Sequence, residues 1–254
     1  MGRRRTAVAL VAIVCAGVAA VLLLARGGRE PAPRRAAPPP PSRQLPGLPP
    51  QVPDRPARGP FGAQLVRRTQ LRAQPGGRVV RALGTHTGYG SERVLAVVAR
   101  RGPWLGVLTD HLRNSRAGWI PVDSVTLLHE PYTLHVDLSK RELVVHHEGR
   151  RVRRITIAVG RPGNTTPTGR FAVTDLLRIS RRDPAYGCCA LALTGRQPNV
   201  PQGWSGGDRI AIHGTTNETT LGSPVSSGCL RAGDRDMRWL LERIPLGAPV
   251  RIRA

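Results

Sequence analysis

The 254-residue chain is long enough for one large domain or two small ones, each with a buried core. Its formal net charge of +23 arises from 39 Lys and Arg against 16 Asp and Glu. Such a balance suits nucleic acid, an anionic membrane or wall polymer, or simply a basic surface. Few aromatic residues are present (4 Trp, 3 Tyr and 2 Phe), and the arginines are spread thinly along the chain. We therefore expect a basic surface and no nucleic-acid partner.

The first 26 residues predict a membrane anchor. Residues 6–25 form an uncharged apolar run, and three arginines in MGRRR precede it. As a helix this run spans roughly 30 Å, the thickness of a bilayer core. The arginines favour a cytoplasmic N-terminus, so we expect a single-pass protein of the cytoplasmic membrane whose remaining residues lie on the wall or periplasmic side. A cleaved signal peptide is the alternative, although no clear small-residue cleavage site follows the run.

Residues 27–62 have the composition of a disordered linker. Of the 24 prolines, 12 fall within residues 31–60, and arginines accompany them. Such a segment buries no core and favours extended polyproline II geometry, which would hold the rest of the chain away from the membrane.

Residues 63–129 predict a small β-barrel. Short apolar runs such as VVRALG, RVLAVVAR and WLGVLT are separated by turn sequences such as PGG and RGP. Five or six short strands in about 65 residues are typical of a barrel. The spacing of LRA (71–73), PGG (75–77), WL (104–105) and GWI (118–120) resembles bacterial SH3-like domains, which often accompany wall enzymes.

Residues 130–254 predict a second, mainly β unit with one short helix. TLHVDLSKRELVVHHEG reads as a hairpin, and RRITIAVG, RFAVTDLL, CCALALTG, DRIAIHG and PVRIRA read as further strands. Residues 234–244 predict the helix, with Asp234 as its N-cap. Its apolar face, at helical spacing, comprises Met237, Leu240, Leu241 and Ile244.

Cys229 and His213 are the candidate catalytic pair. A free thiol has a pKa near 8.5, so a base or a cation must assist it at neutral pH. His213 ends the apolar strand IAIHG, and Cys229 lies in the loop SPVSSGCLR. A histidine at a strand end and a cysteine in a loop can meet across a site, but Cys229 can equally be a structural thiol.

The small residues around Cys229 suit an acyl-transfer site. Gly228 removes a side chain next to the thiol, and backbone N–H groups at residues 227–229 are candidates to hold an oxyanion. Arg231 is a cation that can favour the thiolate or bind a substrate carboxylate.

Two further cysteines, Cys188 and Cys189, are adjacent in the chain. Adjacent residues of a strand point to opposite faces, so at most one of them could approach Cys229. Outside the cytoplasm, three thiols favour formation of a disulfide. A disulfide that included Cys229 would remove the nucleophile or make its activity redox-dependent. Two packed free thiols at these positions are the expectation we favour.

The segment HGTTNETTLGSPVSSGCLR closely resembles the active-site motif of the L,D-transpeptidases, the YkuD-type catalytic family. The matching positions, in order, are His213, Gly214, Gly222, Ser226, Gly228, Cys229, Leu230 and Arg231. The resemblance extends over about residues 131–254 and includes the element TPTGRF at 166–171 and a later Tyr-Gly pair. It implies the β-sandwich of that family with one short helix.

The resemblance also implies an activity. Peptidoglycan stem peptides would be the partners, Cys229 would form a thioester acyl-enzyme, and His213 would accept the thiol proton. Gly214 would orient His213 through its carbonyl, Ser227 and Gly228 would help to hold the oxyanion, and Ser226 and Arg231 would contact the substrate. Neither a metal nor another cofactor is expected. The alternatives are an L,D-carboxypeptidase that passes the same thioester to water and a non-catalytic wall-binding protein.

The motif departs from the family at Ser227. Many members carry histidine directly before the Gly-Cys pair. This departure leaves the acid and base work to His213, the only histidine in the last hundred residues.

Overall fold

The computed structural model of the protein describes residues 61–180, 184–199 and 207–254, all of which belong to one compact unit. The predicted membrane span and the proline-rich linker lie outside the described residues. Within the described part, no helix is long and apolar enough to cross a membrane.

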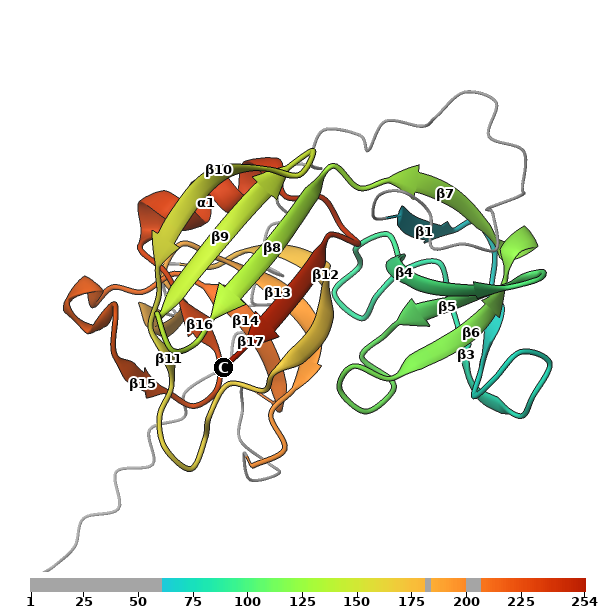
Figure 1. Ribbon diagram of the computed structural model, residues 1–254, viewed down its shortest axis with the longest axis horizontal. Coiled ribbons are helices and arrows are strands. Elements are labelled where there is room, and N and C mark those ends of the chain that lie inside the picture. Colours follow the sequence, from blue (N-terminus) through green and yellow to red (C-terminus); the bar gives the residue numbers. More distant parts are fainter. Residues whose placement is uncertain (1–60, 181–183, 200–206) are drawn as a thin grey trace, which may run out of the picture. The chain divides into compact units, whose positions relative to one another are not determined.

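The first sheet, residues 61–129, is antiparallel throughout, in the order β3-β2-β6-β5-β4-β1-β7 (Figure 1). Its seven strands are β1 (Phe61–Leu65), β2 (Thr69–Arg72), β3 (Val79–Leu83), β4 (Val94–Arg101), β5 (Trp104–Leu108), β6 (Ala117–Pro121) and β7 (Val125–His129). A single 3-10 turn, Val122–Ser124, joins β6 to β7. The structure thus has more strands here than the sequence predicted. In this strand order β3 and β7 are edge strands, so the sheet is not closed into the predicted barrel. The SH3-like resemblance stays a prediction.

The second sheet has eight strands in the order β10-β9-β8-β17-β12-β13-β14-β16. These strands are β8 (Tyr132–Asp137), β9 (Glu142–His147), β10 (Arg150–Thr156), β12 (Gly169–Arg178), β13 (Cys189–Arg196), β14 (Arg209–His213), β16 (Leu230–Arg231) and β17 (Pro249–Arg253). A separate parallel pair is formed by β11 (Val159–Gly160) and β15 (Pro224–Ser226). Short 3-10 turns occur at Pro184–Tyr186 and Glu218–Thr220.

Strand β12 joins the two halves of this sheet. Its first residues pair with β17, and its later residues pair with β13 after a register shift between Val173 and Asp175. Side chains from both halves, among them Leu134, Phe171 and Ile212, are buried in one hydrophobic core. This shared core and the mainly β content agree with the predicted β-sandwich.

The helix α1 (Asp234–Arg243) forms as its apolar spacing predicted. Met237 and Leu240 are fully buried in the core, Leu241 is 3% exposed, and Ile244, just after the helix, is fully buried. The predicted cap is wrong: Gly233 occupies the N-cap position, and no side chain caps the helix. The Asp234 carboxylate instead accepts a hydrogen bond from the Cys188 N–H, 3.0 Å away. A tertiary contact has therefore displaced the local capping preference.

Glu130, between β7 and β8, is completely buried, and neither of its carboxylate oxygens accepts a hydrogen bond from the described residues. Burial raises the pKa of this carboxyl from 4.5 to about 8. The folded protein therefore holds a proton at neutral pH that the unfolded chain releases.

We predict that the free energy of unfolding falls as pH rises from about 4.5 to about 8, the window set by this pKa. Glu130→Gln should remove that slope and stabilise the protein at pH 7 by up to about 3 kcal/mol. Urea unfolding at several pH values measures the effect, with the exposed Glu242→Gln as the matched control. Parallel pH profiles of wild type and Glu130→Gln would refute the assignment.

Candidate active site

The parallel pairing of β14 with β16 brings the chain at Cys229 next to the strand that ends at His213. Ile212 lies opposite Leu230, and His213 lies opposite Arg231. Ile212 and Leu230 point into the core. Because side chains alternate along a strand, His213 and Arg231 point to the opposite face. Cys229 directly precedes β16, and its Sγ lies 4.0 Å from the carbonyl oxygen of Arg209 in β14.

The His213 ring is held in one orientation. It is 3% exposed, and its Nδ1 lies 2.7 Å from the carbonyl oxygen of Gly214, which is the contact expected from the sequence. A carbonyl oxygen only accepts, so Nδ1 carries the proton and Nε2 is the basic nitrogen. The Tyr186 ring packs against the imidazole with 4.9 Å between ring centroids. The ring of His213 is thus held from two sides, by Gly214 and by Tyr186.

The Cys229 thiol is half-buried and free of any disulfide. Its Sγ lies 4.0 Å from the carbonyl oxygen of Arg209, to which it donates a weak hydrogen bond. Burial raises the pKa of this thiol above its ordinary value, while a hydrogen bond with the Ala211 backbone and the charge of Arg231 lower it. A thiol in this state needs a base to become a nucleophile at neutral pH.

The loop before Cys229 is fixed by the Ser226 hydroxyl. This hydroxyl donates to the Cys229 carbonyl oxygen at 2.5 Å and accepts from the Gly228 N–H at 3.1 Å. Ser226 itself is 1% exposed. The expectation that Ser226 contacts substrate stays a prediction; in the structure its side chain is buried and holds the loop. The Gly228 N–H is engaged with Ser226, which leaves the N–H groups of Ser227 and Cys229 as the predicted oxyanion donors.

Gly228 is required by its conformation and by its neighbour. Its φ of 120° lies in a region that favours glycine, and a Cβ here would lie 2.4 Å from Nε2 of Gln197. Gln197 is 3% exposed and anchored by hydrogen bonds to the carbonyls of Asn164 and Thr165. Sequence reasoning missed Gln197, because no local pattern shows which residue packs against a distant loop.

Arg231 lies on the His213 face of the sheet. Its backbone pairs with Ala158, and its Nε is buried without a hydrogen-bond partner among the described residues. A guanidinium with an unmet donor beside a thiol can bind an anionic group of a substrate. The substrate contact of Arg231 stays a prediction.

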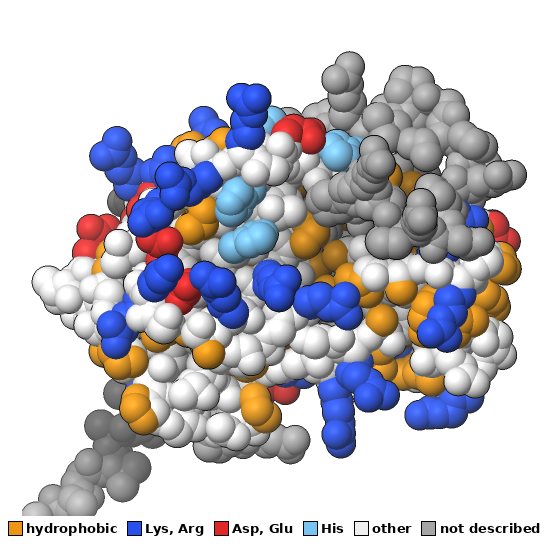
Figure 2. Space-filling model, viewed as in Figure 1, with side chains coloured by type: hydrophobic (Ala, Val, Ile, Leu, Met, Phe, Trp, Pro, Cys, Tyr) orange, Lys and Arg blue, Asp and Glu red, His pale blue; other side chains and the backbone are white. Residues whose placement is uncertain are grey.

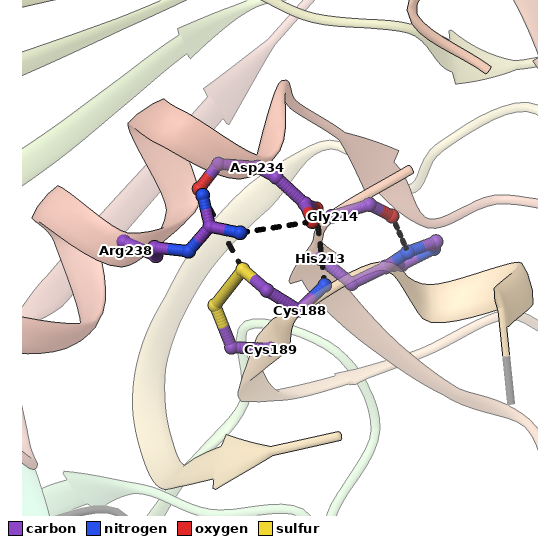
Figure 3. The surroundings of a disulfide bond; sticks show 6 residues. All are labelled: Cys188, Cys189, His213, Gly214, Asp234 and Arg238. Atoms are coloured by element: carbon purple, nitrogen blue, oxygen red, sulfur yellow. Dashed lines mark hydrogen bonds and ion pairs between the residues drawn. A yellow bond between two sulfur atoms is a disulfide. The ribbon is translucent and has the colours of Figure 1, made fainter. Parts of the chain in front are cut away.

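Cys188 and Cys189 form a disulfide with each other, so the expectation of two free thiols is wrong (Figure 3). The argument from opposite faces fails because β13 begins only at Cys189, and Cys188 follows a turn at Gly187, whose φ is 60°. Figure 3 shows the bridge between α1 and the end of β14, with the Cys188 N–H directed to Asp234. Cys229 remains the free thiol of the described residues.

Tyr186 and Gly187 also support the site without having been assigned a role from the sequence. A Cβ at Gly187 would lie 2.5 Å from both the Gly214 carbonyl carbon and the Thr215 nitrogen. The chain can therefore pass close behind His213 only as glycine. The Tyr-Gly pair in the sequence could have pointed to these two residues. In the structure the Tyr186 ring packs against the His213 ring.

A thiol, an imidazole whose Nδ1 is held by the Gly214 carbonyl and a partly buried guanidinium therefore belong to the β14–β16 end of the second sheet. This set of groups can carry out nucleophilic acyl transfer, in which the thiol is activated by the base. His213 is built into a strand, so its position is defined better than a loop would allow.

Comparison with known proteins gives a consistent family. Residues 131–252 match the family model of the L,D-transpeptidase catalytic domain, YkuD. A Bacillus licheniformis protein assigned as L,D-transpeptidase YkuD is 32% identical over 122 residues, which is 48% of this chain and 66% of that protein. A Bacillus subtilis protein assigned as L,D-transpeptidase YqjB is 31% identical over 141 residues, 52% of this chain and 76% of that protein.

Solved structures are similar over about half to two thirds of the chain. An L,D-transpeptidase from Mycobacterium tuberculosis H37Rv aligns with a TM-score of 0.42 and 18% identity over 65% of this chain and 73% of that chain. One from Mycobacterium smegmatis aligns with a TM-score of 0.38 and 18% identity over 54% of this chain and 73% of that chain.

We predict that alkylation of Cys229 by iodoacetamide follows a pH profile whose midpoint lies above that of free cysteine, because burial disfavours the thiolate. Arg231→Gln should raise the midpoint further, since it removes a charge that lowers this pKa. The exposed Arg235→Gln is the matched control. The assignment fails if the midpoint lies at or below that of free cysteine, or if Arg231→Gln lowers it.

Proposed function

Because the chain belongs to the L,D-transpeptidase family, we propose that it cross-links peptidoglycan stem peptides through a thioester on Cys229. The observation that supports the proposal is the β14–β16 pairing, in which His213, with its ring held by Gly214, lies opposite Arg231, two residues after Cys229.

In the first half-reaction, Nε2 of His213 accepts the proton of the Cys229 thiol. The sulfur attacks the carbonyl carbon of the peptide bond between an L-centre and a terminal D-residue. The C–N bond then breaks, the imidazolium returns the proton to the leaving amine, and the acyl group stays on Cys229 as a thioester. The Nδ1–H bond to Gly214 keeps the ring in the tautomer that both transfers need.

In the second half-reaction, the amine of a neighbouring stem attacks the thioester. His213 accepts the proton that the amine loses and returns it to the departing sulfur, so the enzyme is restored. During both steps the N–H groups of Ser227 and Cys229 stabilise the oxyanion. Ser226 acts as a positioning residue, because its hydroxyl fixes the loop that carries these donors.

Arg231 is proposed to bind a carboxylate of the stem peptide. Its Nε lacks a partner within the described residues, and its charge also assists the thiolate. Ser227 takes no part in proton transfer in this scheme, since His213 performs both proton transfers.

The same thioester can pass to water, which would make the protein an L,D-carboxypeptidase. The two outcomes share every residue named above and differ only in whether an acceptor amine reaches the thioester before water does. We place the transpeptidase first because the family and the relatives carry that activity in their descriptions.

We also propose that the apolar run at residues 6–25 anchors the protein in the cytoplasmic membrane, with the folded residues on the side where peptidoglycan lies. The proline-rich segment that follows would then set the reach of the catalytic unit from the membrane.

A basic surface favours a second, binding role on the same molecule. Figure 2 shows Lys, Arg and His side chains over β8, β9 and β17. A hollow of about 440 Å³ on this surface is lined by His135, Lys140, His146, Arg151, Arg251 and Arg253, together with two acidic residues. Such a surface can hold an anionic wall polymer, which would retain the enzyme on its substrate.

We predict that a defined tetrapeptide stem, incubated with the protein and an acceptor amine, yields cross-linked dimer and the released D-residue. Cys229→Ala should abolish both products, and His213→Gln should lower the rate at least 100-fold, because the base is lost. Cys188 and Cys189, which form a disulfide with each other, stay unchanged in both variants. Liquid chromatography with mass spectrometry identifies the products.

Release of the D-residue without dimer would assign the protein as the carboxypeptidase. Dimer formation by Cys229→Ala would contradict the proposed function altogether.

A further inference from the structure

The outer face of the half-sheet β10-β9-β8-β17-β12 carries a row of basic side chains (Figure 2). Inward-facing residues of these strands, such as Leu134 and Ile252, lie in the core, and residues directly opposite each other on neighbouring strands share a face. In order across the five strands, the row consists of Arg154, Val144, His135, Arg251 and Arg170. Four strand spacings make this row about 19 Å long, which is several times the width of a single small anion.

The free charges of this outer face are positive. Three arginines are exposed, and their side chains form no hydrogen bond or ion pair within residues 61–180, 184–199 and 207–254: Arg151, Arg170 and Arg251. The two acids that line the hollow are already paired, Glu142 with Arg154 at 3.0 Å and Asp137 with Arg253 at 2.8 Å. An anion that binds here therefore meets unpaired cations and displaces no acid.

Two histidines line the hollow together with Arg151 and Arg251. His135 on β8 and His146 on β9 are diagonal neighbours, and their ring centroids lie 4.7 Å apart. Arg251 lies opposite His135, and Arg151 lies opposite His146. The Nδ1 atom of His146 is buried and has no hydrogen-bond partner among the described residues. Each imidazole thus has the other imidazole and an arginine as neighbours.

These neighbours oppose protonation of the imidazoles. Burial, and after it the positive charges of His146, Arg251 and Arg253, hold the pKa of His135 below its ordinary value. The other charged groups of the hollow are Arg151, Lys140, Asp137 and Glu142. An anion placed among these groups would offset the positive charge around His135. Because that change raises the pKa of the imidazole, binding of the anion and uptake of a proton favour each other.

We propose that this outer face binds a phosphodiester polymer that carries no nucleobases, and that His135 and His146 take up protons when it binds. The row of cations is too long for one small anion, which favours a polymer. The outward-facing residues of these strands include no Trp, Tyr or Phe on which a base could stack. Arginine favours phosphate, and a phosphodiester keeps its charge at the pH where imidazole is protonated, whereas a carboxylate begins to lose its charge near pH 4 to 5.

The proton uptake would make retention of the polymer depend on pH. Affinity should rise as pH falls, since the polymer-bound protein has the higher imidazole pKa, and the polymer should be released as pH rises. That the polymer belongs to the cell wall rests on the proposed function. The binding itself requires neither Cys229 nor His213, which lie at the β14–β16 end of the sheet.

The test measures binding of poly(glycerol phosphate) to the full chain in nonionic detergent, by isothermal titration calorimetry at constant ionic strength. We expect at least tenfold tighter binding at pH 5.5 than at pH 7.5. At pH 6.5, titrations in two buffers of different ionisation enthalpy should show net proton uptake. An enthalpy that does not depend on the buffer would overturn the proton link.

Substitutions on this face and matched controls locate the site. His135→Gln combined with His146→Gln should reduce the tenfold pH effect to less than threefold, whereas His86→Gln, at an exposed histidine of the first sheet, should leave it unchanged. Arg251→Gln should weaken binding at least fivefold at both pH values, and the exposed Arg78→Gln should not. Thermal unfolding checks that each variant is folded; these side chains are exposed or half-buried, so substitution leaves the fold intact.

The contrary outcomes are distinct. An unchanged pH effect in the double histidine variant would overturn the role of the imidazoles, and full binding by Arg251→Gln would place the polymer elsewhere. Equally tight binding of a single-stranded oligonucleotide with the same number of phosphates would contradict the choice of a base-free polymer. Equally tight binding of polyglutamate would contradict the preference for phosphate.

The Cys229→Ala protein separates this inference from the proposed function. It should bind poly(glycerol phosphate) with the affinity and the pH dependence of the wild type, because the thiol takes no part. A wild-type protein that binds in this way but neither cleaves nor cross-links a stem peptide would contradict the proposed function alone. An active enzyme whose polymer binding does not change with pH would contradict this inference alone.

Discussion

The short parallel pairing between β14 and β16 is the constraint on which the site depends. Two strand residues on each side set the register, with Ile212 opposite Leu230 and His213 opposite Arg231. The buried pair of Ile212 and Leu230 fixes which face each neighbour takes, because a slip of one residue would send the catalytic side chains into the core. The hydrophobic core of the sandwich therefore specifies the chemistry, since it decides where His213 and the thiol of Cys229 point.

Close backbone packing completes what the register begins. Gly187 passes behind His213 and Gly214 at a distance that leaves no room for a Cβ, and Gly228 is backed by the amide of Gln197 in the same way. The segment that follows Gly187 is held by the Cys188–Cys189 disulfide and by the hydrogen bond from the Cys188 N–H to the Asp234 carboxylate (Figure 3). The base and the loop of the nucleophile are thus held from behind by parts of the chain far apart in sequence. Such preorganisation is what a thiol and a base in one active site require.

Local patterns predicted much of this protein, and long-range contacts account for the rest. The helix at residues 234–244, the hairpin of residues 133–149 and the Cys229–His213 pair follow from periodicity and motif, and the structure forms the first two as expected. The prediction that Asp234 caps the helix is wrong because its carboxylate accepts a hydrogen bond from the N–H of Cys188, the residue before β13. The hydrogen bonds by which Ser226 holds the loop could not be predicted, because burial is not visible in a motif. No local pattern in the chain shows which strands meet. The contacts of Gln197 and the Cys188–Cys189 disulfide depend on that arrangement, so the sequence did not predict them.

The central claim is that Cys229, activated by His213, becomes acylated. Intact-protein mass spectrometry after incubation with a tetrapeptide stem, followed by peptide mapping, tests it directly. The account predicts a covalent adduct with the mass of the stem minus its terminal D-residue, located on the peptide that contains Cys229 and absent from Cys229→Ala. An adduct on any other residue, or turnover of the stem by the Cys229→Ala protein, would contradict it.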